Sequence, residues 1–108
     1  MIINKTKKSV VAKDKKLCTS AFSKFKGLMF TKKAKCLVFV NKKEIPTPIH
    51  MMFMLYPIDV IWLDKNKKVV HVQKLKPWQL SKSVAAKYVI ELPEGLAKNV
   101  SVGDRIEF

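Results

Sequence analysis

Short apolar runs separated by polar or proline-containing turns fill the chain from residue 36 onward. Runs of this length, rich in β-branched and aromatic residues, predict β-strands rather than helices. We expect strands at residues 37–41, 49–55, 58–63, 69–75, 88–92 and 105–108, with a short first strand at 9–13. The polar turn at residues 64–67 joins two of these runs and predicts a β-hairpin.

One early segment has helical spacing instead, carried by the apolar residues Phe22, Phe25, Leu28 and Met29. We expect an amphipathic helix of about two or three turns there. It begins after Thr19 or Ser20, which can cap it, and ends at Gly27, which tolerates left-handed backbone. A second, shorter helical turn is expected at residues 93–97.

These elements predict one domain over residues 1–108 with a mainly β fold. A compact six- to seven-stranded β-sandwich or open barrel with one or two short helices fits the count and order of the runs. The sequence contains no internal repeats, linkers or low-complexity segments.

The high positive charge of the chain raises the question of nucleic-acid binding. Its formal net charge is +14, from 22 lysines and arginines against 8 acidic residues, and Arg105 is the single arginine. Bidentate recognition of phosphates and bases favours arginine, so a solvated basic surface is preferred over specific nucleic-acid binding. Weak, salt-sensitive binding to polyanions is expected from charge alone.

The sequence also predicts where in the cell the protein is located. No apolar run approaches the ~20 residues of a membrane-spanning helix, and residues 1–5 lack the apolar segment of a secretory signal. We therefore expect a soluble cytoplasmic protein with no membrane partner. Cys18 and Cys36 have no CxxC spacing and are expected to stay reduced.

Four segments, in order, resemble the domain of unknown function 192 family. They are the Gly-Leu-Met motif within residues 26–30, the central strand pair within 49–64, the Leu-Glu-Leu-Pro-like segment 88–95 and the closing turn 102–105. The resemblance covers nearly the whole chain from about residue 20. It implies a small β-rich fold and no established activity.

The chain departs from the family pattern at one place. Many members read Trp-Met-Lys-Asn-Thr where this chain has His50-Met51-Met52-Phe53-Met54. Roles assigned to that motif are therefore not carried over to Met52 or Phe53.

This departing stretch holds one set of candidate site residues. If residues 49–55 are extended, His50, Met52 and Met54 share one face, because residues two apart on a strand point the same way. An imidazole beside two thioethers is a ligand set suited to Cu(I). The simpler interpretation is that the methionines fill gaps in the core, so we assign no metal and no cofactor.

Asp59 and Trp78 complete the candidate site. Asp59 follows Pro57 and shares a strand face with Ile61 and Leu63, so we expect it to be largely buried. It either accepts backbone hydrogen bonds from a neighbouring loop or acts as a carboxylate with a perturbed pKa. Trp78 lies in a polar segment, where it either rims a pocket or folds back over the core.

Three functions compete on these grounds. The first is a small soluble binding domain with a ligand or partner cleft near His50, Asp59 and Trp78. The second is a small enzyme that uses Asp59 and His50 as acid and base. The third is a basic adaptor for RNA or another polyanion, which would need lysines clustered on one face.

Overall fold

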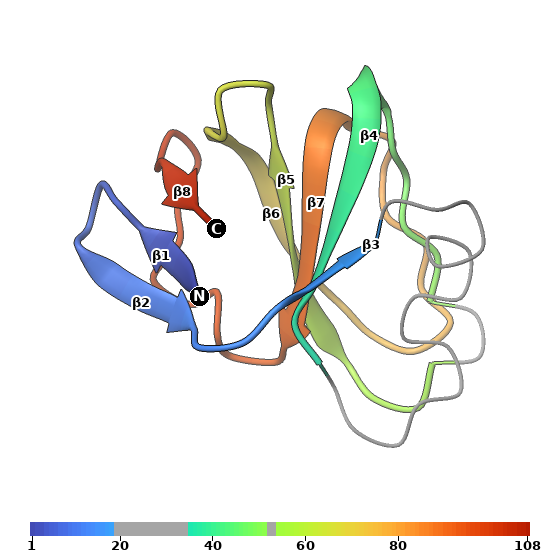
Figure 1. Ribbon diagram of the computed structural model, residues 1–108. Coiled ribbons are helices and arrows are strands. Elements are labelled where there is room, and N and C mark those ends of the chain that lie inside the picture. The colour runs from blue at the N-terminus through green and yellow to red at the C-terminus, as the bar shows by residue number, and fades with distance from the viewer. Residues whose placement is uncertain (19–34, 52–53) are drawn as a thin grey trace.

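The computed structural model describes residues 1–18, 35–51 and 54–108, and within these ranges two β-sheets form (Figure 1). A three-stranded sheet has the order β2-β1-β8, and a five-stranded sheet has the order β3-β4-β7-β5-β6. The strands are β1 (Ile2–Asn4), β2 (Ser9–Ala12), β3 (Lys16–Cys18), β4 (Leu37–Pro46), β5 (Ile58–Leu63), β6 (Val69–Leu75), β7 (Ala85–Pro93) and β8 (Ile106–Glu107). The sheets do not close on each other, so the mainly β prediction is confirmed in its sandwich-like form.

β7 is the middle strand of the larger sheet. It pairs antiparallel with β4 on one side and with β5 on the other, while β3 runs parallel to β4. All six residues of β5 are buried. A strand without a polar face is typical of a sheet covered on both sides.

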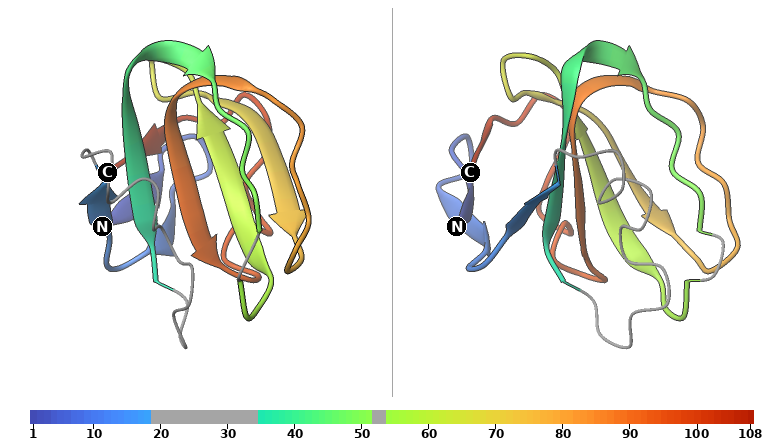
Figure 2. Two further views of the ribbon diagram at one scale, coloured as in Figure 1. Left: turned by 90° about the vertical axis from the view of Figure 1, so that its right-hand side faces the viewer. Right: turned by 45° about the vertical axis from the view of Figure 1, so that its right-hand side comes forward.

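Two hydrophobic clusters cover the two faces of the five-stranded sheet. On the first face, Ile61 of β5 and Ile90 of β7 pack in a cluster with residues of the small sheet such as Ile2 and Ile106. On the second face, Val60 and Val89 pack in a cluster with Met51 and Met54. Figure 2 shows β1, β2 and β8 on one side of the large sheet and the chain leading from β4 to β5 on the other. Side chains on the two faces of the large sheet are therefore packed in two separate clusters.

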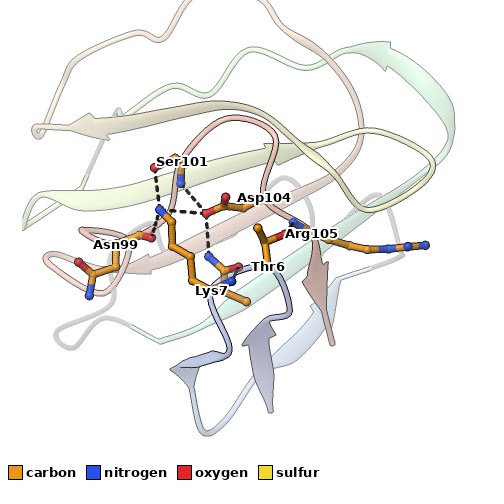
Figure 3. A network of polar contacts seen from close by, with 7 residues as sticks. Thr6, Lys7, Asn99, Ser101, Asp104 and Arg105 are labelled. Carbon is orange, nitrogen blue, oxygen red and sulfur yellow. Dashed lines mark hydrogen bonds and ion pairs between the residues drawn. The ribbon is translucent and has the colours of Figure 1, made fainter.

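A polar network fastens the small sheet to the turn before β8 (Figure 3). The Asp104 carboxylate accepts hydrogen bonds from the buried Asn4 side chain at 2.8 Å and from the Ser101 backbone N–H at 2.9 Å, and it lies 3.2 Å from the Lys7 ammonium. Lys7 also donates to the Asn99 carbonyl at 2.6 Å. The network makes a buried carboxylate compatible with the core.

The expected strand at residues 49–55 is wrong for the residues that the structure describes. His50 forms only an isolated bridge with Leu80, and Met51 and Met54 are not in a strand. The apolar density there reflects burial of Met51 and Met54 under an irregular segment. A buried irregular run and a buried strand have the same composition, so periodicity does not separate them.

The expected helix near residues 20–29 lies outside the described residues.

The helical turn expected at residues 93–97 is found as successive turns over residues 94–99, which are not assigned as a helix. The Leu96 N–H donates to the Pro93 carbonyl, and the Val100 N–H donates to the Ala97 carbonyl. Within the described ranges, no helix is long and apolar enough to cross a membrane.

Candidate functional site

A pair of irregular segments, 47–51 and 78–84, lies beside the second face of the large sheet. They run antiparallel through backbone hydrogen bonds that share a length of 2.7–2.8 Å: Thr47 N–H to Val84 O, Ser81 N–H to Ile49 O, Met51 N–H to Gln79 O, and Trp78 N–H to Met51 O. The indole N–H of the fully buried Trp62 donates to the Thr47 carbonyl at 2.8 Å and ties this segment pair to β5. The segment pair is thus held in a fixed position without being part of a sheet.

Trp78 has the most unusual geometry in the segment pair. Its φ angle is +66°, in the left-handed region that bulky residues rarely adopt, and the residue is 62% exposed. The backbone hydrogen bond to the Met51 carbonyl holds this conformation. Strained backbone of this kind is concentrated at binding and active sites.

His50 and Leu80 lie next to each other across the segment pair. Their isolated antiparallel bridge places the two side chains on the same side. His50 is exposed, and Leu80 is 69% exposed. The structure therefore brings two of the predicted site residues, His50 and Trp78, onto one segment pair and adds the apolar Leu80.

Met54 does not share an exposed strand face with His50. Its side chain is buried in the second-face cluster together with Met51, and Met52 lies outside the described residues. Among the residues that the structure describes, no three His, Cys, Asp or Glu side chains are grouped to hold a metal ion. The packing interpretation fits the position of Met54.

Asp59 lies on the opposite side of the sheet from this segment pair. As expected, it is buried. Its Oδ2 accepts the backbone N–H groups of Gly95 at 2.9 Å and Ala97 at 3.0 Å, and Ala97 belongs to the first-face cluster. A shallow hollow of about 450 Å³ opens beside it, bordered by the Lys74–Glu94 ion pair at 2.9 Å. Asp59 therefore anchors the turn after β7, as its loop-holding interpretation describes.

Glu91 is a candidate that the sequence reasoning missed. It lies on β7 between Leu37 of β4 and Val60 of β5, on the second face, and is only 7% exposed. In the described part of the chain, no hydrogen bond or ion pair reaches its carboxyl group. Burial raises the pKa of Glu91 from 4.5 to about 7.

Two further polar side chains extend the polar character of this face. Gln73 of β6 lies opposite Val60 and next to His71, whose ring packs on Trp62 with the centroids 5.0 Å apart. His71 Nε2 and Gln73 Oε1 are 3.2 Å apart.

The sequence signal that could have found Glu91 is a single acidic residue inside an apolar strand. Alternation alone does not show which face of the sheet this residue occupies.

Comparison with known proteins supports the fold and leaves the activity open. A UPF0127 protein of Pyrococcus horikoshii is 40% identical over 113 residues, covering 100% of this chain and 98% of that protein. A UPF0127 protein of Thermococcus kodakarensis is 42% identical over 114 residues, covering 100% of this chain and 73% of the relative.

A solved structure from Novosphingobium aromaticivorans, of a protein of unknown function, superposes with a TM-score of 0.77 at 20% identity. It covers 87% of this chain and 74% of that one. The sequence model of the family DUF192, described as "Uncharacterized ACR", matches residues 2–108. The resemblance seen in the four sequence segments is thereby confirmed, and the chain belongs to the DUF192 family of uncharacterised proteins.

Proposed function

We propose that the protein is a small binding domain without catalytic activity, whose small or extended ligand docks on the segment pair 47–51 and 78–84. The observation that carries this proposal is Trp78, a bulky aromatic residue that is 62% exposed and whose backbone lies in the left-handed region. An exposed aromatic side chain has few rotatable bonds, so it supplies contact area at little cost in conformational entropy.

Neighbouring groups support the same location. His50 and Leu80 add a polar and an apolar contact on the exposed side of the segment pair. The second face of the sheet, on which Met51 of the segment pair packs, also carries the Glu91 carboxyl beside Leu37 and Val60. Apolar walls with a few polar groups and a perturbed carboxyl are typical of ligand sites.

An acid–base enzyme built on Asp59 and His50 has less support. The two residues lie on opposite sides of the large sheet, and Asp59 Oδ2 is engaged by two backbone N–H groups. One proton relay would need both side chains within hydrogen-bond reach of the same substrate. A cytoplasmic location and weak polyanion binding stay predictions.

Native mass spectrometry tests the proposal on untagged protein purified gently, without chelator, from its own or a related host. We expect an additional mass on the wild-type protein that is absent from Trp78→Ala. Val102→Ala is the matched control, because Val102 is a similarly exposed apolar residue (67%) outside the segment pair. Equal retention of the additional mass in both variants would place the ligand elsewhere.

Fluorescence quenching then tests the location independently. Trp62 is fully buried, so acrylamide should quench mainly Trp78. A ligand bound to the segment pair should protect this emission. A bound ligand that leaves quenching unchanged would contradict docking on Trp78.

A further inference from the structure

A second surface, at the other end of the β5–β6 hairpin, gathers basic side chains through backbone pairing. The Lys5 N–H donates to the Arg105 carbonyl at 2.7 Å, and the Ile106 N–H donates to the Lys67 carbonyl at 2.9 Å. These hydrogen bonds surround a hollow of about 270 Å³ whose lining residues are Lys5, Asn66, Lys67, Arg105, Ile106 and Glu107. The only arginine of the chain therefore lies beside lysines from two other segments.

An aromatic pair next to this hollow holds further lysines in place. The rings of Tyr88 and Phe108 meet edge to face with centroids 5.2 Å apart. The Lys67 ammonium lies 4.2 Å from the Phe108 ring centroid and 5.8 Å from that of Tyr88. Lys15 lies 5.5 Å from Phe108, and Lys87 lies 5.8 Å from Tyr88. Cation–π interactions thus restrain the Lys15 and Lys67 ammonium groups. The Lys87 ammonium also donates hydrogen bonds to the backbone carbonyls of Asn41 and Lys42.

Little negative charge compensates these groups. In the part of the chain that the structure describes, Lys5 pairs with Glu107 at 3.3 Å, whereas Lys67 and Arg105 form no ion pair. The nearby Asp64 carboxylate accepts two N–H groups of its own turn, at 2.8 and 3.0 Å. Figure 3 shows the Arg105 side chain extending away from the Asp104 network, with only its backbone N–H bonded there, to Thr6 at 2.8 Å.

We propose that this basic surface, formed by Lys5, Lys15, Lys67 and Arg105, binds the phosphates of a single-stranded nucleic acid. Lys67 and Arg105, which have no carboxylate partner in the described part of the chain, are available to neutralise phosphates and release counterions. Restrained lysines lose less side-chain entropy on binding than freely rotating ones. The cations surround a hollow and two half-buried rings, an arrangement that admits a flexible strand more readily than a rigid duplex.

This inference is independent of the Trp78 site. The basic surface lies at the turn of the β5–β6 hairpin, and Trp78 follows the opposite end of β6 (Figure 1). The loss of one binding activity therefore does not predict the loss of the other.

Fluorescence anisotropy with a labelled single-stranded oligouridylate tests the proposal. The full-length protein is compared with the double variant Lys67→Asn and Arg105→Gln, in which asparagine is chosen because it tolerates the left-handed φ of +62° at Lys67. The control double variant, Lys82→Gln and Lys98→Gln, removes the same net charge from exposed lysines elsewhere. Thermal melting confirms that all three proteins are folded.

We expect the surface variant to weaken binding by about tenfold or more at moderate salt and the control variant to weaken it much less. The slope of log affinity against log salt should fall by about 0.7 for each phosphate that the surface variant no longer neutralises. Equal weakening in the two variants would reduce the effect to net charge and overturn the proposal. Absence of binding by the wild-type protein at low salt, or tighter binding to a duplex of the same length, would also overturn it.

Discussion

Replacing Glu91 by glutamine should alter how stability depends on pH. Burial raises the pKa of this carboxyl from 4.5 to about 7 in the folded protein. The unfolded chain therefore releases the proton near pH 4.5, whereas the folded protein keeps it until about pH 7. In this window the folded state binds more protons, so stability falls as the pH rises. Because a tenfold change in proton affinity corresponds to about 1.4 kcal/mol, the total loss is about 3 kcal/mol.

Urea denaturation, followed by the fluorescence of the buried Trp62, measures this effect. The free energy of unfolding of Glu91→Gln relative to wild type should rise by about 3 kcal/mol between about pH 4 and about pH 8. Glu107→Gln, which removes an exposed carboxyl, is the matched control. A difference between Glu91→Gln and wild type that stays constant over this range would refute the buried, uncompensated state of Glu91. Glu91 would then no longer support the proposed binding site.

Substitutions at three other residues test single interactions. Asp59→Ala should lower the free energy of unfolding by about 1–3 kcal/mol, because the N–H groups that Asp59 binds lose their acceptor. Asp59→Asn should lower it by less. An unchanged melting temperature for Asp59→Ala would contradict the anchoring role. Trp78→Gly should be more stable than Trp78→Ala by about 1 kcal/mol in thermal denaturation, because glycine adopts positive φ without strain; equal stability would mean that the left-handed conformation carries no strain. For Asp104, burial opposes ionisation, but its hydrogen bonds and the Lys7 charge outweigh burial and lower its pKa below 3.8. Its stabilisation is therefore present above pH 3.8 and lost as the pH falls through the lower folded value. Asp104→Asn should make acid unfolding, followed by circular dichroism, less steep, and an unchanged acid transition would contradict this.

The relative positions of His50 and Asp59 could not be predicted from the sequence. His50 and Asp59 are nine positions apart, and Pro57 between them gave no indication that the chain passes from an irregular segment into a strand. Asp59 faces the turn after β7, whereas His50 faces solvent beside Leu80. The position of His50 is set by the pairing of residues 47–51 with the segment 78–84. That pairing joins residues about 30 positions apart, which a local pattern does not specify.

Local patterns in the sequence were enough to predict the mainly β fold, the strands near β5, β6 and β7 and the hairpin between β5 and β6, because these depend on short apolar runs bounded by turn residues. They were also enough to predict that Asp59 would be buried. The face of the sheet that each residue of β5 occupies became known only from the structure. β5 is apolar on both sides, so its sequence does not show which residues face which cluster. The same applies to Glu91 and to the basic surface. A carboxyl acquires its raised pKa from the residues packed around it, and Lys5, Lys67 and Arg105 become neighbours only when β1, the β5–β6 turn and β8 come together.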